Sequence, residues 1–389
     1  MGYRLKATSV HFARALYALN WFDIAPGLTA ISKDLGLQLV QLGIATTSFY
    51  IGLSALQLVG GALASKIGSR KIAFIGLVLL GAGAIFSGLS MNLLELVVGR
   101  FIAGSGSALF FSPGLSILRD ISPPESYGLQ VGIYNGAFNL GGAVGAFGWV
   151  FVDKALGWQT GLILGGMLVI AISIENLIVL RGQDEVKAES TGFYEKIFTI
   201  LKNKYLWLLP IGTVIAMFVE TVGAQFLVYF GENFLYFASS EAGLVDFVFL
   251  LIGFPAGIVA GHYISNPKTR RPYTYITMVI GGLAFMMVPF GRTFALTTAI
   301  VALAGFTVVS GFSALYVLAV QHVREKSMIP FAISFVNFVG IAIGSVSPFL
   351  FTLFTHGIGP DYGWIILGAI GLALLPLFFI SKSKEVPGS

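Results

Sequence analysis

Long apolar runs alternate with short polar segments along the whole chain. Twelve of these runs are long enough to cross a bilayer as helices, because a helix rises about 1.5 Å per residue and the hydrocarbon core is about 30 Å thick. The predicted spans lie near residues 8–30, 39–62, 72–90, 94–118, 129–152, 160–180, 205–230, 242–264, 273–290, 294–318, 329–354 and 364–380. The pattern therefore predicts an all-α polytopic membrane protein.

The composition agrees with this prediction and narrows the class. Hydrophobic residues make up 56% of the chain and charged residues 11%, which lies outside the range of ordinary soluble domains. Cysteine is absent, so neither disulfides nor thiolate metal sites are expected. The net charge of +5 does not point to nucleic acid, because the basic residues gather in short segments between apolar runs.

The distribution of Lys and Arg predicts the orientation of the spans. Eighteen of these residues fall on the side of the two termini, and only Lys33, Lys154 and Arg292 fall on the opposite side. Basic loops stay in the cytoplasm, so we expect both termini there, in a multi-pass protein of the cytoplasmic (inner) membrane.

One long polar stretch divides the chain. Residues 181–204 are expected to form a cytoplasmic linker between an N-terminal half, 1–180, and a C-terminal half, 205–389. Within the linker, the pattern of Phe193–Leu201 is typical of a helix on the membrane surface. A plain solvated linker remains the alternative.

A compact basic turn follows the second span and has a counterpart in the second half. The turn is Gly61-Ala-Leu-Ala-Ser65-Lys66-Ile-Gly68-Ser-Arg70-Lys71, and residues 261–271 repeat its pattern at an offset of 200. Transporters are often built from two such related halves.

These residues resemble the motifs of the major facilitator superfamily. The turn resembles the signature loop between its helices 2 and 3, with Ser65 in place of Asp and Lys66 in place of Arg, and Arg100-x3-Gly104-x-Gly106 resembles its fourth-helix motif. The resemblance implies twelve transmembrane helices in two pseudo-symmetric six-helix halves. It also implies that Gly61, Ser65, Lys66, Gly68, Arg70 and Lys71 form part of an inner gate.

Two details refine the resemblance. The segment Asn20-Trp-Phe-Asp23 is similar to the Asn-Tyr-x-Asp-Arg of the organic-anion symporters, but Ile24 stands where their arginine would be. Drug exporters of the superfamily carry Gly-Pro at the end of the fifth-helix motif, whereas here Gly145 is followed by Ala146.

Ionisable residues inside predicted spans are the candidates for function, because burying a charge in a bilayer is costly. Asp23 follows Asn20 by three residues, so both are expected on one face of a helix. Glu220 lies at a comparable depth in span seven. Burial favours the neutral form of a carboxyl group, so we expect Asp23 and Glu220 to exchange protons as water access changes.

Other polar residues in the spans have more than one interpretation. Arg14 and Asn20 are candidates for substrate binding or proton coupling, and Arg14 is expected to reach the interface or to line the inner vestibule. Arg100 is expected to avoid lipid, with a purely structural role open. Glu175 and Asp246 are expected to reach toward the interface. Asn139 and Asn337 either bind solute or bridge helices.

The sequence thus predicts a secondary transporter for a small organic solute. Spans two, seven and eight hold no arginine, which favours a neutral, zwitterionic or weakly anionic solute over a multiply charged anion. No nucleotide-binding motif or cofactor site is present in the sequence, so an ion gradient, most simply of protons, is the expected energy source. We expect a monomer in the bilayer that binds no nucleic acid.

Two alternatives remain open at this point. One is a drug or metabolite efflux antiporter. The other, from a different class, is a membrane sensor or assembly factor that keeps the fold without transport. An enzyme is not expected, because the spans hold no metal-ligand cluster or nucleophile–base pair at usable spacing.

Overall fold

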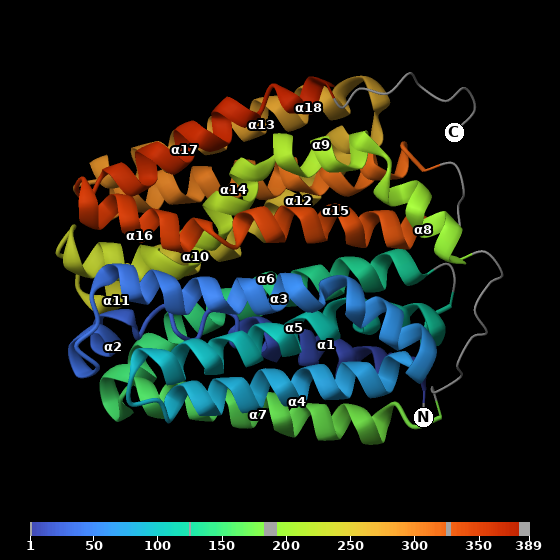
Figure 1. The fold of residues 1–389 in the computed structure, drawn as a ribbon, viewed down its shortest axis with the longest axis horizontal. Coiled ribbons are helices and arrows are strands. Elements are labelled where there is room, and N and C mark those ends of the chain that lie inside the picture. Colours follow the sequence, from blue (N-terminus) through green and yellow to red (C-terminus); the bar gives the residue numbers. More distant parts are fainter. Residues whose placement is uncertain (1, 124–125, 183–192, 324–327, 381–389) are drawn as a thin grey trace. The chain divides into compact units, whose positions relative to one another are not determined.

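The computed structural model describes residues 2–123, 126–182, 193–323 and 328–380, and in these ranges every regular element is a helix (Figure 1). The charged part of the predicted linker, 183–192, lies outside the described residues. The helix predicted within the linker is present with the same bounds, as α8.

The helices up to residue 182 are long and closely spaced in the chain. They are α1 (Tyr3–Leu19), α2 (Leu28–Asp34), α3 (Leu39–Ile67), α4 (Ser69–Gly88), α5 (Leu93–Ile121), α6 (Tyr127–Leu156) and α7 (Trp158–Val179). The rest of the chain forms α8 (Phe193–Leu201), α9 (Lys204–Gly212), α10 (Val214–Asn233), α11 (Ser239–Leu251), α12 (Gly253–Ser265), α13 (Pro267–Met287), the 3-10 turn η2 (Val288–Phe290), α14 (Phe294–Val320), α15 (Ile329–Gly344), α16 (Ser347–Gly357), α17 (Tyr362–Leu374) and α18 (Leu377–Ile380).

Over the described ranges these helices account for the twelve predicted spans. Spans seven, eight, eleven and twelve each consist of two consecutive helices, α9 with α10, α11 with α12, α15 with α16 and α17 with α18. In the first half only span one is divided, into α1 and α2. The prediction of a continuous helix near 8–30 is therefore wrong, because residues 20–27 form turns.

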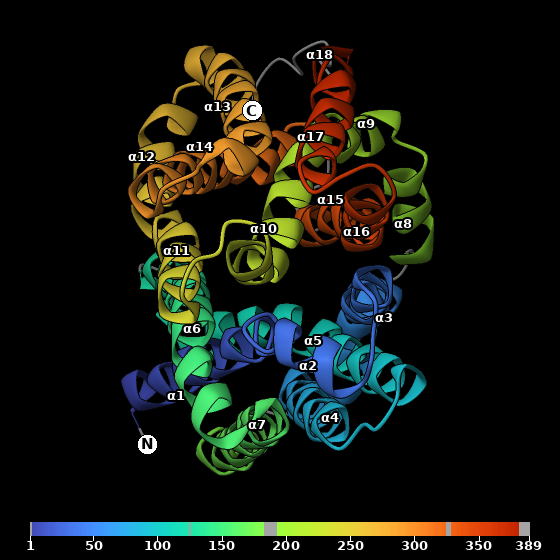
Figure 2. The same cartoon turned by 90° about the vertical axis from the view of Figure 1, so that its left-hand side faces the viewer.

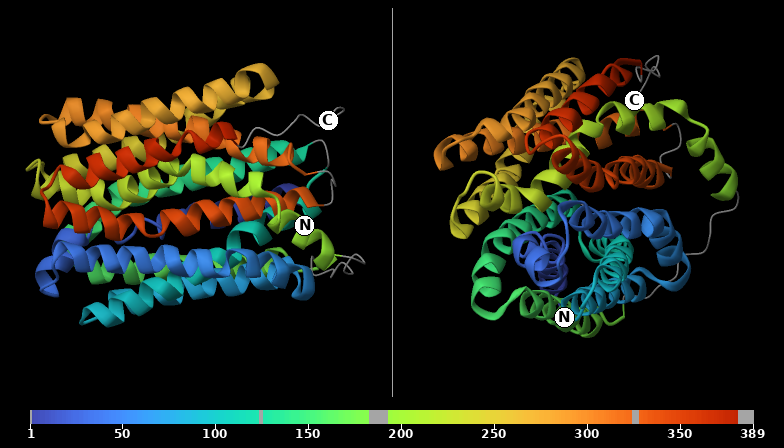
Figure 3. Two further views of the ribbon diagram at one scale, coloured as in Figure 1. Left: turned by 45° about the horizontal axis from the view of Figure 1, so that its top comes forward. Right: turned by 60° about the vertical axis from the view of Figure 1, so that its left-hand side comes forward.

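The chain forms two compact units. The first holds Met1–Glu189 with Gln225–Leu251, and the second holds Ser190–Ala224 with Ile252–Ser389. In the first unit α4 packs against α5 and α7, α5 also packs against α3, and α1 packs against α6 and α7 (Figure 2). In the second, α13 packs against α14 and α17, orange to red in Figure 3.

The surface of the helices is apolar, as a bilayer requires. In the described part of the chain, ten helices or consecutive helix pairs are long and apolar enough to span a membrane. Large side chains such as Leu94, Ile178 and Ile258 are 66–72% exposed. A soluble protein would not leave so many such side chains in water, so these faces suit lipid.

Residues 61–71, predicted to form a basic turn between two spans, are mostly helical. α3 continues to Ile67, and α4 begins at Ser69. Arg70 donates from Nε to the Leu177 carbonyl oxygen at 3.2 Å, and Arg271 donates from Nη1 to that of Phe378 at 3.3 Å. Both bonds span 107 residues, so the two basic turns are anchored in the same way within their own units.

In each of two helix pairs of the first unit, one glycine connects the two helices. Gly68 joins α3 to α4 with φ of 99°, and Gly157 joins α6 to α7 with φ of 84°. A residue with a Cβ atom rarely adopts such backbone angles, because the Cβ clashes with the following peptide group. Glycine at these positions therefore allows consecutive antiparallel helices without a longer loop.

Replacing Gly68 by Ala is expected to lower the free energy of unfolding by about 1–3 kcal/mol, the cost of a strained backbone residue. Gly61→Ala is the matched control, because Gly61 lies in the exposed part of α3 with no atom within 4 Å of a new Cβ. It should leave stability unchanged or raise it by about 0.5–1 kcal/mol. Thermal unfolding of the purified protein in detergent measures both, and equal effects would contradict the role of the turn.

Candidate functional site

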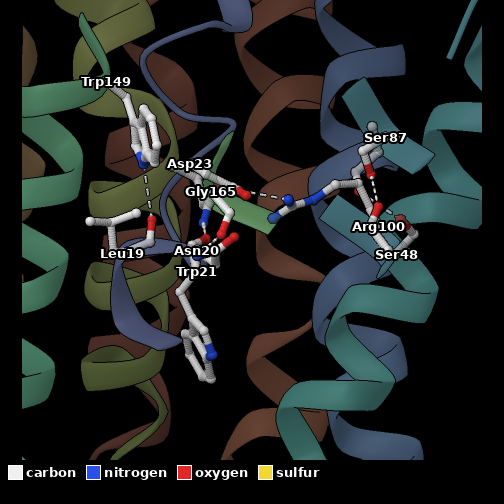
Figure 4. A network of polar contacts seen from close by, with 12 residues as sticks. Leu19, Asn20, Trp21, Asp23, Ser48, Ser87, Arg100, Trp149 and Gly165 are labelled. Atoms are coloured by element: carbon white, nitrogen blue, oxygen red, sulfur yellow. Dashed lines mark hydrogen bonds and ion pairs between the residues drawn. The ribbon is translucent and has the colours of Figure 1, made fainter. Parts of the chain in front are cut away.

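The break in span one positions Asp23. α1 ends at Leu19, where the indole Nε1 of Trp149 donates to the Leu19 carbonyl oxygen at 3.3 Å (Figure 4). The Asn20 amide Nδ2 donates to the carbonyl oxygens of Leu16, at 3.0 Å, and Gly165, at 3.1 Å. These bonds fix the end of α1 to α6 and α7. Asn20 and Asp23 are thus not on one face of a helix, contrary to the prediction.

Asp23 forms a buried ion pair with Arg100. The Arg100 Nη1 lies 2.7 Å from the Asp23 Oδ1, and the two residues are 0% and 2% exposed, respectively (Figure 4). The guanidinium also lies 4.8 Å from the ring centroid of Phe49. The Asp23 Oδ2 and the Arg100 Nε are buried without a hydrogen-bond partner. The pair therefore uses only part of its bonding capacity.

The glycines of the fourth-helix motif allow α5 to bring Arg100 to this position. A Cβ at Gly104 would overlap the carbonyl oxygen of Phe49 in α3, and a Cβ at Gly106 would overlap the backbone nitrogen of Leu80 in α4. Small residues at this spacing let helices approach closely within a membrane. The motif thus has a packing role, and it places Arg100 in the interior of the first unit.

Residues 225–251 add polar contacts to the same unit. The Gln225 Nε2 donates to the Trp21 carbonyl oxygen at 3.0 Å and to the Tyr50 hydroxyl at 3.2 Å. Further along α10, the Thr29 hydroxyl donates to Glu232 at 2.5 Å. These bonds hold residues 225–233 of α10 against the segment that carries Asp23. Sequence reasoning did not single out Gln225.

Two further carboxyl groups of the first unit are buried. Asp246 in α11 is 0% exposed, and neither of its oxygens has a hydrogen-bond partner. The prediction that it reaches the interface is therefore wrong. Asp153 in α6 also has both oxygens buried and unpartnered. Glu175, the other acid expected at the interface, accepts a hydrogen bond from the Ser9 hydroxyl at 2.5 Å.

Arg14 lies inside a group of aromatic rings. Its guanidinium carbon is 4.4–4.9 Å from the ring centroids of Tyr17, Phe111, Tyr134 and Phe138. The residue is 5% exposed. It does not reach the interface as one interpretation predicted, because α5 and α6 supply rings on either side of it.

The remaining predicted residues occupy separate places. Glu220 is half-buried in the part of α10 that belongs to the second unit, whereas Asp23 belongs to the first. Asn337 is buried in the second unit and accepts a hydrogen bond from the Tyr316 hydroxyl at 2.8 Å. Asn139 is half-buried in α6. The position of the Ser65 side chain lies outside the described part of the structure.

The other residues of the basic turn differ in exposure. Lys66 and Lys71 are exposed, and Arg70 is partly buried through its bond to Leu177. Among the described residues no group of three or more His, Cys, Asp or Glu side chains is arranged to hold a metal ion. The chemistry of the site is therefore that of an ion pair, aromatic rings and amide groups.

Sequence reasoning did not pair Arg100 with Asp23, although a usable signal was present. Asp23 and Arg100 are among the few charges of the first-half spans, with Arg14, Glu95 and Glu175, and charges within a membrane usually pair with one another. The aromatic surroundings of Arg14 gave no comparable signal, because the rings come from positions 17, 111, 134 and 138.

Comparison with known proteins identifies a family from the sequence and a similar fold among solved structures. Residues 10–345 match the family model of the Major Facilitator Superfamily. The structure is similar to that of a bacterial homolog to the human lysosomal transporter Spinster in an inward-facing and occupied conformation, with a TM-score of 0.75 and 16% identity. That match covers 96% of this chain and 94% of the other, and it concerns the fold.

Curated relatives are more similar in sequence but match only about half of the chain. The chain is 28% identical over 192 residues to the nitrite extrusion protein of Bacillus subtilis, covering 49% of this chain and 47% of that protein. It is 27% identical over 204 residues to the quinolone resistance protein NorA of Staphylococcus aureus, covering 51% and 50%. The chain thus spans about half the length of these curated relatives.

Proposed function

The chain belongs to the Major Facilitator Superfamily, and from this premise we propose that it is a proton-coupled secondary transporter of a small organic solute. In such proteins two halves rock about a central site, which opens alternately to either side of the membrane. The relatives named for nitrite extrusion and for quinolone resistance support the transport class. The names of these relatives do not identify the solute of this chain, which has to be inferred from its own residues.

The observation that carries the proposal is the buried pair of Asp23 and Arg100. A carboxylate that accepts one bond from a guanidinium keeps an oxygen free for a proton, here the Asp23 Oδ2. Protonation removes the negative charge that holds Arg100, so binding of a proton and release of the pair are one event. Proton uptake can in this way change which arrangement of α1 and α5 is stable.

The local backbone supports movement at this point. Asp23 lies in the turns at 20–27, between α1 and α2, and not within a helix. Moving such a segment breaks fewer backbone hydrogen bonds than moving a residue of a continuous helix. The polar contacts of Gln225 with Trp21 and Tyr50 would be made and broken in the same step.

Other predicted residues take supporting roles in the proposal. Glu220 in α10 is a second site for a proton. Asn139 and Asn337 offer amide groups to the solute, and the basic turn at 61–71 forms part of the inner gate. The distribution of Lys and Arg supports an orientation with both termini and the basic turn on the cytoplasmic side of the inner membrane. We propose that the protein acts there as a monomer.

The test is solute-dependent proton movement in proteoliposomes that contain a pH-sensitive dye. Solutes that do not cross a bilayer unaided, such as gluconate, glutamate, betaine and ethidium, are added to one side in turn. A coupled transporter gives a change of internal pH with at least one of them, which vesicles with the Asp23→Asn protein do not show. Solute uptake that moves no protons contradicts the coupling.

The same measurement separates the alternatives. Proton and solute movement in one direction indicates symport, and movement in opposite directions indicates a drug or metabolite antiporter. A sensor with this fold would bind a solute, measured by its stabilising effect on the purified protein, and would move neither solute nor protons.

A further inference from the structure

Arg14 is a buried cation without a charged partner. No carboxylate of the described residues forms an ion pair with it, and its Nε and Nη1 atoms are buried without hydrogen-bond partners. The residue is 95% buried, since only 5% of its surface is exposed. Taking a guanidinium out of water is costly unless its N–H groups are satisfied. The first unit thus keeps a cation whose bonding capacity is partly unused.

The four rings around the guanidinium compensate for part of this cost. Each attracts a cation placed over its face, and the distances of 4.4–4.9 Å are within the range of such contacts. Rings do not satisfy N–H donors as an oxyanion does. The arrangement therefore stabilises the cation when the site is empty and leaves its donors for an incoming anion.

The four rings differ in burial. Tyr17 and Tyr134 are buried and held in place, with the Tyr17 hydroxyl donating to the Ser107 carbonyl oxygen at 3.3 Å and the Tyr134 hydroxyl to that of Phe111 at 3.1 Å. Phe111 and Phe138 are only half-buried. The two phenylalanines are therefore the less enclosed side of the group, and the ligand proposed below would approach Arg14 from that side.

A row of aromatic rings in contact continues from Arg14 toward the ion pair. Phe138 contacts both Tyr17 and Trp21, with ring centroids 6.3 and 5.2 Å apart, and Trp21 lies 5.4 Å from Phe49. Phe49 in turn lies against Arg100. The indole Nε1 of Trp21 is buried and unpartnered. A ligand bound at Arg14 would lay an apolar or aromatic body along these rings.

We propose that Arg14 and its surrounding rings bind the head group of an organic carboxylate with an aromatic or apolar body. A planar carboxylate matches the guanidinium, which can donate two parallel N–H bonds to it. This proposal rests on the proposed transport function and names the class of its solute. It selects the anionic option among the neutral, zwitterionic and weakly anionic solutes that the sequence left open.

The site is tested by binding to the full-length protein in detergent, with phenylacetate and its neutral amide, phenylacetamide, as probes. The two differ in charge but hardly in shape. We expect phenylacetate to bind at least tenfold more tightly, measured by titrating the apparent unfolding temperature. Binding of both probes with equal affinity, or of neither, overturns the proposal.

Variants then locate the binding. Arg14→Gln should weaken phenylacetate binding at least tenfold and change phenylacetamide binding less than twofold, and Arg14→Lys should give an intermediate affinity because it keeps the charge without the bidentate geometry. Arg119→Gln is the matched control, since Arg119 is an exposed arginine paired with Asp120. An equal loss of affinity in the control overturns the assignment to Arg14.

A second variant keeps the test valid if Arg14→Gln does not fold. Phe138→Leu removes one half-buried ring and should weaken phenylacetate binding severalfold; unchanged affinity counts against the site. The result is independent of proton coupling. Phenylacetate binding without any proton movement contradicts the transport proposal alone, and proton movement with other solutes but no preference for the carboxylate contradicts this site alone.

Discussion

Replacing Asp23 by Asn is expected to abolish solute-driven proton movement and to lower stability by about 3–5 kcal/mol, the cost of leaving one member of a buried ion pair unpaired. The amide cannot take up and release a proton, and Arg100 remains fully buried without a counter-charge. Thermal unfolding of the purified protein measures the loss of stability, and the dye assay in proteoliposomes measures the loss of coupling.

A double replacement separates the two effects. In Asp23→Asn with Arg100→Gln, neither charge is left unpaired, so most of the lost stability should return, because the main cost of the single variant is its uncompensated buried charge. Coupling should not return, since no group at this position binds a proton. A double variant that moves protons like the wild type would refute the role of the pair.

Asp120→Asn is the matched control for this experiment. Asp120 also pairs with an arginine, its Oδ1 lying 3.2 Å from the Arg119 Nε, but their side chains are 35% and 48% exposed. Exposed pairs contribute little, so this variant should change stability by less than about 1 kcal/mol and leave coupling intact. Similar losses at positions 23 and 120 would show that burial is not what makes the Asp23 pair important.

Replacing Gly104 by Ala is expected to destabilise the first unit by about 1–3 kcal/mol or more, the usual cost of forcing extra volume into a packed interior. The new Cβ would overlap the Phe49 carbonyl oxygen and push α5 away from α3. Because α5 carries Arg100, coupling should also weaken. Apparent unfolding temperature and proton movement measure the two effects.

Gly132→Ala provides the comparison. Gly132 is an exposed helical residue of α6, with no atom within 4 Å of an added Cβ. Alanine favours a helix over glycine by about 1 kcal/mol, so this variant should be at least as stable as the wild type. If the two substitutions have the same effect, close packing of the fourth-helix motif does not explain its glycines.

Local patterns were sufficient for much of the fold. The lengths of the apolar runs predicted the spans, and the repeated basic turn predicted two related halves, whose turns are anchored by bonds of equal sequence separation from Arg70 and Arg271. The helix Phe193–Leu201 was also predicted from its own pattern. The spans and this helix each depend on residues within about one helix length, whereas the two related halves are recognised from a pattern that repeats at an offset of 200 residues.

Other features were outside the reach of local patterns. Nothing between residues 8 and 19 indicates that α1 ends at Leu19, since Asn20 is held there by Gly165, 145 residues further along the chain. Asp246 looked close to an interface because its distance from the end of the apolar run was counted along the chain. Its burial depends on how α11 packs against α6.

The sequence by itself determined that this protein crosses the membrane many times, belongs to a two-half architecture and keeps acids and arginines in its spans. Only the tertiary structure decided which of these charges meet. Asp23 and Arg100 are 77 residues apart, and the rings around Arg14 come from three helices. The hydropathy of a segment depends only on residues that are neighbours in the chain. Which charges pair depends on distances between side chains, and these are set only when α1 packs among α5, α6 and α7.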